Sequence, residues 1–133
     1  MIRVCTSMYA NPFHKGHLAL VREAKKLGDY LIVIVNNDLQ VGLKGSKRFM
    51  DERERCEIVS AIKYVDEVIL SVDTDRTVRE TLKLVKPDIF AKGGDSTNDN
   101  VPEQEVLDLL KTKLVLNVGG GKIQSSSTLK NAI

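Results

Sequence analysis

The stretch Ile2–His17, which reads IRVCTSMYANPFHKGH, places a strand, a turn and the start of a helix in immediate succession. Residues 2–7 form a short apolar run that is typical of a buried strand. Residues 11–13, Asn-Pro-Phe, predict a turn. The two histidines that follow therefore fall at the junction between the first strand and the first helix, where open parallel sheets bind their ligands.

The same alternation of strand and helix continues along the chain. Leu20, Ala24 and Leu27 recur at helical spacing, and Gly28 after them fits the C-terminal stop of this helix. Further strands are expected at residues 30–35, 65–72, 88–91 and 114–117, and further helices at about 51–62, 78–85 and 106–110. This pattern predicts an α/β fold, a Rossmann-like open parallel sheet of five strands with helices on both faces, in a single domain of residues 1–133.

Several local details accompany this prediction. The segment Val41–Met50 is polar and basic and is expected to be irregular. Thr77 and Glu80 have the spacing of a capping box at the start of a helix. The inward helix faces are expected to carry Ile58, Val59 and Ile62 in one helix and Val106, Leu109 and Leu110 in another.

Composition excludes several classes of protein. A net charge of +2 with 29% charged residues gives no argument for a nucleic-acid or membrane partner. No apolar stretch approaches the roughly 20 residues of a membrane span, and the N-terminus does not resemble a signal peptide, so a cytoplasmic protein is expected. Cys5 and Cys56 are far apart and form no metal-binding pattern, which predicts two free thiols.

His14-Lys15-Gly16-His17 is the motif that points to chemistry. Its two histidines, the only ones in the chain, lie three residues apart and so share one face of the helix start. The helix start also offers free backbone N–H groups and the positive end of the helix dipole, and Gly16 is expected to let an anion approach the backbone. Such a cradle suits phosphoryl-type transfer, in which the protein positions the reactants and stabilises negative charge. No third ligand has zinc-site spacing, so no protein metal site is predicted.

The segment Asn11–His17 resembles the HxGH signature of the cytidylyltransferase-like superfamily of nucleotidyltransferases. The resemblance extends along essentially the whole chain and implies the HUP-type nucleotidyltransferase fold. The further matching segments are LKG at 43–45 with Arg48, AIKYVDEV at 61–68, KPD at 86–88, KGGD at 92–95 and SSS at 125–127. The segment AIKYVDEV is similar to glycerol-3-phosphate cytidylyltransferases, whereas KPD and KGGD are similar to heptose 1-phosphate adenylyltransferases of lipopolysaccharide-core synthesis.

Roles follow from this resemblance by position. It implies that His14, His17 and Lys44 are catalytic and act on the phosphates. It implies that Asp38 and Arg55 bind the acceptor, with Arg55 either a structural or a phosphate-facing arginine. The implied nucleotide-binding residues are Tyr9, Ala10, Asn11, Phe13, Gly16, Lys92, Gly93, Asp95, Ser125, Ser126 and Ser127. It also implies Mg²⁺ held mainly by the nucleoside triphosphate, and a homodimer.

Two departures from the family pattern affect the expected pocket. Met8 stands where many members have glycine, and Ala10 where many have an aromatic residue. Met8 is expected to crowd the approach to the nucleotide. The arginine that usually precedes the C-terminal motif is missing, and Gly119-Gly120-Gly121-Lys122 occupies its place.

The leading hypothesis is an enzyme that transfers AMP from ATP to a sugar 1-phosphate-like acceptor and releases pyrophosphate. One alternative is a cytidylyltransferase that uses CTP on glycerol 3-phosphate or a similar phosphoalcohol. A second is a flavin mononucleotide (FMN) adenylyltransferase, which the absence of an evident aromatic platform disfavours. A third, from a different class, is a nucleotide-binding sensor without catalysis. The sequence leaves the identity of the acceptor open.

Overall fold

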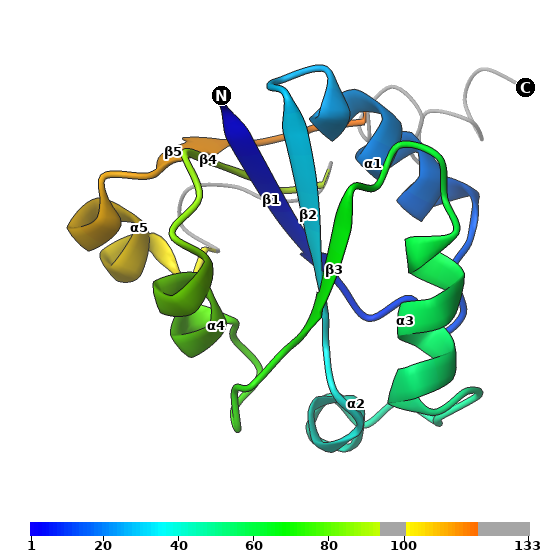
Figure 1. Cartoon of the computed structure of the whole chain (residues 1–133). Coiled ribbons are helices and arrows are strands. Elements are labelled where there is room, and N and C mark those ends of the chain that lie inside the picture. The colour runs from blue at the N-terminus through cyan, green and yellow to red at the C-terminus, as the bar shows by residue number, and fades with distance from the viewer. Residues whose placement is uncertain (94–100, 120–133) are drawn as a thin grey trace, which may run out of the picture.

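A parallel sheet forms the centre of the protein, as predicted. The computed structural model describes residues 1–93 and 101–119. Within them the strands are β1 (Arg3–Met8), β2 (Tyr30–Val35), β3 (Glu67–Leu70), β4 (Ile89–Ala91) and β5 (Lys113–Val115). Their order is β3-β2-β1-β4-β5, with every neighbouring pair parallel (Figure 1). The order reverses beside β1, so the switch point lies between β1 and β4.

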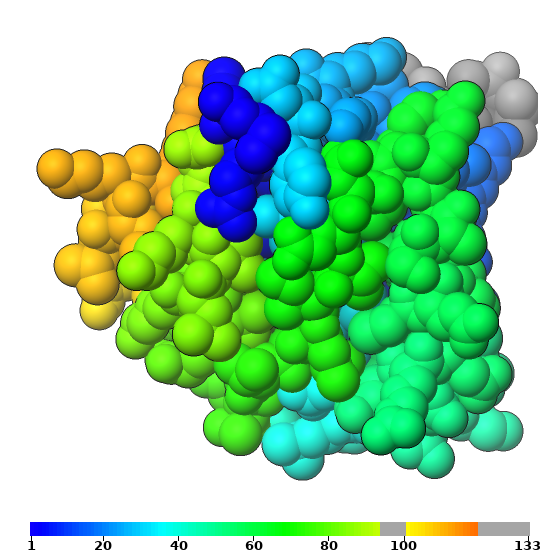
Figure 2. Space-filling view, viewed as in Figure 1, coloured from blue at the N-terminus to red at the C-terminus, as the bar shows by residue number. Residues whose placement is uncertain are grey.

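Helices cover both faces of this sheet. They are α1 (Lys15–Lys25), α2 (Asp38–Lys44), α3 (Glu52–Ser60), α4 (Arg79–Val85) and α5 (Gln104–Leu110). The helices α1 and α3 pack on one face, α4 and α5 pack on the other, and α2 follows the carboxyl end of β2 (Figure 1). Viewed from the β3 side, side chains fill the space that the ribbon leaves open between α3 and α4 (Figure 2).

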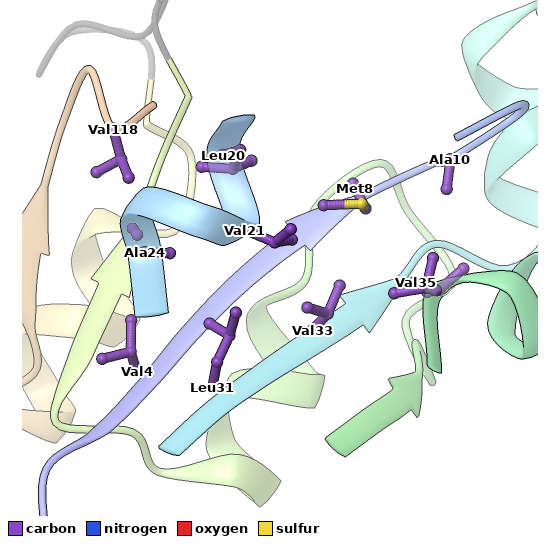
Figure 3. Close-up of a cluster of buried hydrophobic side chains, with 12 residues drawn as sticks. Val4, Met8, Ala10, Leu20, Val21, Ala24, Leu31, Val33, Val35 and Val118 are labelled. Atoms are coloured by element: carbon purple, nitrogen blue, oxygen red, sulfur yellow. The ribbon is translucent and has the colours of Figure 1, made fainter. Parts of the chain in front are cut away.

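The central strands supply side chains to both faces. On β2, Leu31, Val33 and Val35 join the cluster under α1 and α3, whereas Ile32 and Ile34 join the cluster under α4 and α5 (Figure 3). All five are fully buried. This explains why the strand reads as an unbroken apolar run, because a parallel strand covered on both faces has no solvent-facing side.

Part of the segment predicted to be irregular is a helix. Asn37 accepts the backbone N–H of Gln40 at 2.9 Å, and the Gln40 side chain accepts the backbone N–H of Asn37 at 3.0 Å. This reciprocal capping box starts α2, and Gly45, in the left-handed region with φ 81°, ends it. The prediction was wrong because the polar and basic composition of the segment hid the capping signal.

Two other local predictions were wrong. Thr77 and Glu80 form no capping box at α4, because the buried carboxylate of Asp73 accepts the backbone N–H of Glu80 at 2.7 Å and that of Thr81 at 3.0 Å. Ile58 and Leu109 were expected to face inward, but they are 40% and 74% exposed. Both helices are short, and a shift of one position in the assumed helix face accounts for the error.

Gly28 is needed for packing and not for the helix stop proposed from the sequence. A Cβ there would lie 2.7 Å from Val4 Cγ2 and 2.8 Å from the Ile2 carbonyl oxygen. The helix α1 instead ends with Lys26 as its C-cap in a right-handed conformation. The Ile2 carbonyl oxygen belongs to the backbone, so it cannot move aside as the end of a flexible side chain could.

Gly28→Ala is therefore expected to lower the free energy of unfolding by about 1–3 kcal/mol, the range typical of overpacking. Gly42 in α2 is the matched control, because a Cβ there meets nothing within 4 Å. Gly42→Ala should raise the free energy of unfolding by about 0.5–1 kcal/mol through helix propensity. Urea denaturation measures both, and a Gly28→Ala variant as stable as the wild type would refute the packing argument.

Candidate active site

The two histidines of the HKGH motif cap the helix that they begin. His14 is the N-cap of α1, and its Nδ1 accepts the backbone N–H of Gly16 at 3.0 Å. The Nδ1 of His17 accepts the backbone N–H of His14 at 3.1 Å. The two rings lie against each other with centroids 3.9 Å apart and planes tilted by 33°.

These bonds determine which ring nitrogen carries the proton. A nitrogen that accepts an N–H bears no hydrogen, so in the neutral ring the hydrogen lies on Nε2. Both imidazoles then have an Nε2–H group left for a ligand. Burial lowers the pKa of His17 to about 4, with further lowering by the charges of His14 and Lys44. His17 is therefore a neutral hydrogen-bond donor near pH 7 and not a cation.

Gly16 matters for a reason that the sequence did not predict. Its N–H is already bonded to His14, and a Cβ at this position would lie 2.9 Å from Cε1 and 3.2 Å from Nδ1 of the His14 ring. The glycine thus makes room for the imidazole that folds back onto the helix start. The expected close approach of an anion to the Gly16 backbone is replaced by this contact.

A small pocket brings the histidines together with Lys44. The pocket has a volume of about 150 Å³ and is lined by Tyr9, Ala10, Asn11, Pro12, His14, His17, Lys44 and Ser46. The ammonium of Lys44 lies 4.2 Å from the centroid of the Tyr9 ring. The structure therefore places the three predicted catalytic side chains around one pocket at the carboxyl edge of the sheet. Phe13 lies beside it, with its ring centroid 5.4 Å from that of His17.

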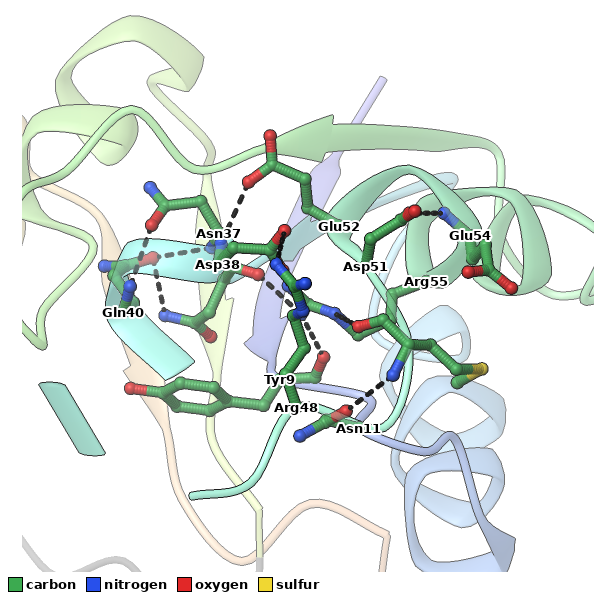
Figure 4. A network of polar contacts seen from close by, with 12 residues as sticks. Tyr9, Asn11, Asn37, Asp38, Gln40, Arg48, Asp51, Glu52, Glu54 and Arg55 are labelled. Atoms are coloured by element: carbon green, nitrogen blue, oxygen red, sulfur yellow. Dashed lines mark hydrogen bonds and ion pairs between the residues drawn. The ribbon is translucent and has the colours of Figure 1, made fainter. Parts of the chain in front are cut away.

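The two residues predicted to bind the acceptor have structural roles. Arg55 is fully buried, and its guanidinium donates to the carbonyl oxygens of Tyr9 (2.7 Å), Asn36 (2.6 Å) and Met50 (3.2 Å) and to Oδ1 of Asp38 (2.8 Å) (Figure 4). The other oxygen of Asp38 accepts from Arg48 at 3.1 Å. Arg55 is thus engaged within the fold, which is the structural alternative for this residue, and the assignment of Asp38 and Arg55 to acceptor binding stays a prediction.

The charge state of Asp38 agrees with this structural role. Burial alone would raise the pKa of Asp38, but the hydrogen bond and charge of Arg55, assisted by Arg48, hold it below its usual value. The Asp38 carboxylate is therefore ionised at neutral pH and offsets the charge of the buried guanidinium. The backbone N–H of Asp38 is also bonded, to Glu52 at 2.9 Å.

Asn11 lines the pocket, but its amide holds a loop. Its Nδ2 donates to the Lys47 carbonyl at 2.8 Å, and its Oδ1 accepts the backbone N–H groups of Phe49 (2.9 Å) and Met50 (3.4 Å). Figure 4 shows Asn11 beside the Arg55 network. The assignment of Asn11 to nucleotide binding stays a prediction. Asn11 fixes the loop that continues from α2 and Lys44.

The two departures from the family pattern do not narrow the pocket. Met8 is 5% exposed, and its side chain packs in the core under α1, away from the pocket lining (Figure 3). The expected crowding by Met8 was therefore wrong. Ala10 is fully buried at φ 52°, in the left-handed region that costs an L-residue about 1–2 kcal/mol. The chain accepts this strain where it turns from β1 toward the histidines.

The remaining predicted residues follow β4 and β5. Lys92 and Gly93 come directly after β4, beside the carboxyl end of β1, and the backbone N–H of Lys92 donates to the Val115 carbonyl at 2.9 Å. Asp95 and Ser125–Ser127 lie outside the described residues, as does Lys122. Their assignment to nucleotide binding stays a prediction.

A larger hollow lies elsewhere and lacks the chemistry of the histidine pocket. It has a volume of about 270 Å³, and its lining mixes acids and bases of α4 and α5 with Asp73, Thr74 and Asp75. In the described ranges, no three His, Cys, Asp or Glu side chains gather as a metal site would require. No helix of the described chain is long and apolar enough to cross a membrane.

A parallel sheet with this switch point and a histidine pair at the start of its first helix defines a nucleotidyltransferase of the HUP type. The comparison with known families agrees, because the cytidylyltransferase-like family model matches residues 9–119. The chain belongs to this family.

Proteins similar to this chain include some named FAD synthase and some named bifunctional protein HldE. The chain is 39% identical to an FAD synthase of Picrophilus torridus, over 90% of this chain and 87% of that one, and 34% identical to an FAD synthase of Thermoplasma volcanium, over 100% and 94%. It is 36% identical to a bifunctional protein HldE of Desulfatibacillum aliphaticivorans, over 89% of this chain but only 24% of that longer one.

A solved structure shares the fold closely. The lipopolysaccharide core biosynthesis protein of Thermoplasma volcanium superposes with a TM-score of 0.75 at 33% identity, covering 87% of this chain and 95% of that one. TmcAL of Thermotoga maritima has a TM-score of 0.60 at 23% identity and supports the fold alone.

The arrangement of the histidines predicts the effect of Gly16→Ala. The added Cβ would push the His14 ring out of its capping position, because the ring is the movable partner. Turnover is expected to fall by about 10- to 100-fold, as for a misplaced positioning group, with little change in thermal stability. Steady-state kinetics and a melting curve test this, and unchanged turnover would contradict the assigned ring position.

Proton NMR of the two histidine rings tests the second consequence. The His17 ring is expected to stay neutral as the pH falls from 7 to 5 and to take up its proton near pH 4, because burial and two nearby basic side chains oppose the charge. Since the chain has only two histidines, His17→Gln identifies the resonances. A His17 midpoint near 6.5 would show that the ring is hydrated and not held as described.

Proposed function

We propose that the protein transfers AMP from ATP to a phosphorylated acceptor and releases pyrophosphate, with FMN as the acceptor. The observation that carries this proposal is the single pocket in which two imidazole Nε2–H groups and the ammonium of Lys44 converge at the start of α1. Imidazole donors and a mobile cation suit phosphates whose charge shifts during the reaction.

The reaction needs no covalent intermediate on the protein. A phosphate oxygen of the acceptor attacks the α-phosphorus of ATP, and the bond from this phosphorus to the bridging oxygen of the β-phosphate breaks. Pyrophosphate leaves with the bonding electron pair. His14 and His17 would donate to the oxygens on which charge builds, and Lys44 would offset the charge of the reacting phosphates. Mg²⁺ would arrive with the triphosphate, since this ion binds phosphates and keeps several waters.

The relatives favour FMN as the acceptor over the sugar 1-phosphate of the leading hypothesis from the sequence. Relatives named FAD synthase match this chain over nearly their whole length, and the chemistry of making FAD from FMN is AMP transfer. Tyr9 also lines the pocket. Its aromatic ring was not predicted from the sequence to be a platform for a flavin. Both points support FMN as the acceptor.

A sugar 1-phosphate is the second candidate acceptor. The specific support is the similarity to HldE and to the solved protein of lipopolysaccharide core biosynthesis. The same attack on ATP would apply, with the anomeric phosphate as nucleophile. A cytidylyltransferase would require CTP in place of ATP, and a sensor would bind nucleotide without turnover.

The test is a product assay on purified protein with Mg²⁺. ATP is paired with FMN, with heptose 1-phosphate and with glycerol 3-phosphate, and CTP is paired with the same acceptors; pyrophosphate release and chromatography identify the product. FAD from ATP and FMN is the expected result.

His17→Ala should lower turnover by about 100- to 1,000-fold without unfolding the protein, as for loss of one transition-state donor.

Lys63→Gln serves as the control variant, because Lys63 is exposed and lies outside the pocket. It should leave turnover unchanged. Nucleotidyl transfer only to a sugar 1-phosphate would replace FMN by the second candidate. Near-normal turnover of His17→Ala would remove the proposed role of the histidine pair.

A further inference from the structure

The ring of Tyr9 is held in the pocket by its backbone. Its carbonyl oxygen accepts from Arg55 at 2.7 Å, and the next residue, Ala10, is buried with a left-handed conformation. Figure 4 shows the ring extending away from Arg55 and Asn11. The backbone on both sides of Tyr9 is therefore fixed, and the ring lines the pocket beside Lys44.

A lysine without a carboxylate partner covers this ring. The ammonium of Lys44 lies 4.2 Å from the ring centroid, and in the described residues it forms no ion pair. The nearby acid Asp38 is occupied by Arg48 and Arg55. Within the described residues, the charge of Lys44 thus faces the π-face of an aromatic ring, a contact that a phosphate would readily replace.

A second cation, Arg76, lies in the segment between β3 and α4 that α2 holds in place. The buried side chain of Gln40 on α2 donates to the carbonyl oxygens of Asp75 (2.7 Å) and Thr77 (2.8 Å), which flank Arg76 in the chain. This fixes the backbone of Arg76 next to the helix that carries Lys44. Burial raises the pKa of the Tyr9 hydroxyl, and the guanidinium of Arg76 beside that hydroxyl opposes the rise.

Lys44 and Arg76 lie on one side of β1 in the sheet, and the residues after β4 that are expected to bind the nucleotide lie on the other side. Lys44 follows β2, and Arg76 follows β3, whereas Lys92 and Gly93 follow β4 on the other side of β1. The histidine pair begins at the end of β1, between the two sides. A triphosphate lying toward β4 would leave the β2–β3 side for the second substrate.

We infer that Tyr9, Lys44 and Arg76 form the acceptor subsite, in which the two cations bind the acceptor's phosphate and the Tyr9 ring stacks on a flat conjugated ring system in the rest of the acceptor. This inference rests on the proposed AMP transfer. It narrows the acceptor to a phosphate ester that also carries a flat conjugated ring system, such as FMN. When the phosphate draws Lys44 away, the face of the Tyr9 ring becomes free for stacking. Nothing in the sequence singles out Arg76, and this inference places Tyr9 with the acceptor and not with the nucleotide, to which the family resemblance assigned it.

Flavin fluorescence measures this binding without requiring turnover. FMN and riboflavin are each titrated with wild-type protein in the presence of Mg²⁺ and α,β-methylene-ATP, a non-reacting analogue, because stacking on tyrosine quenches the flavin. Tyr9→Leu should weaken FMN binding by about 10-fold or more and abolish the quenching, whereas Tyr9→Phe should keep both. Binding of α,β-methylene-ATP, measured by calorimetry, should not change in either variant.

The phosphate contact is tested by Arg76→Gln, an exposed site where folding should not be affected. This variant should weaken FMN binding by about 5- to 10-fold and leave riboflavin binding unchanged. Lys63→Gln is the matched control, since Lys63 covers Tyr64 at 5.2 Å in the same kind of contact elsewhere on the protein. It should alter neither ligand.

Each outcome assigns the failure to one hypothesis. Equal FMN affinity in wild type, Tyr9→Leu and Arg76→Gln overturns the subsite and leaves the proposed AMP transfer standing. Loss of α,β-methylene-ATP binding in Tyr9→Leu overturns it as well, because Tyr9 would then bind nucleotide. If FMN fails to bind but Arg76→Gln weakens calorimetric binding of heptose 1-phosphate, the two cations stand, and both FMN and the stacking role are withdrawn.

Discussion

A buried guanidinium, that of Arg55, holds together the backbone segments from which the candidate site is built. It bonds the carbonyl oxygens at the ends of β1 and β2, at Tyr9 and Asn36, and that of Met50 just before α3. Moving such a charge out of water is costly, and the Asp38 carboxylate offsets that cost at a distance of 2.8 Å. Removing one partner of a buried pair typically costs about 3–5 kcal/mol, so the edge of the sheet depends on this contact.

The histidine site follows from this fixed edge. With the Tyr9 carbonyl bound, the chain turns at Ala10 and enters α1 with His14 as its N-cap. Each imidazole uses Nδ1 to satisfy a backbone N–H at the helix start, a group that would otherwise need water or another partner. Folding and ligand binding thus use different nitrogens of the same rings. The cap fixes the orientation that leaves Nε2–H toward the pocket.

The sequence was informative wherever the signal is local. The strand–helix alternation, the parallel sheet and the place of the HKGH motif were all predicted, because apolar periodicity and chain order determine them. The helix α2 could also have been found, since Asn37 and Gln40 have the spacing of a capping box. The role of Arg55 could not, because its partners are up to 46 residues away in the chain and only the folded sheet brings them together. The burial of Met8 under α1 likewise depends on which face of β1 it occupies.

The charges around the pocket explain why a neutral His17 suits it. The acids near Lys44 are already engaged, with Asp38 bound to two arginines and Glu52 to the start of α2. Burial disfavours a charged imidazole at His17, and the positive charge of Lys44 opposes it further, so the pKa of His17 falls to about 4. A neutral imidazole still donates its Nε2–H to a phosphate oxygen without having to gain a proton. The pocket thus combines a mobile charge at Lys44 with a donor at His17 that stays neutral across neutral pH, which fits a site where the phosphates of two substrates must meet and pyrophosphate must then leave.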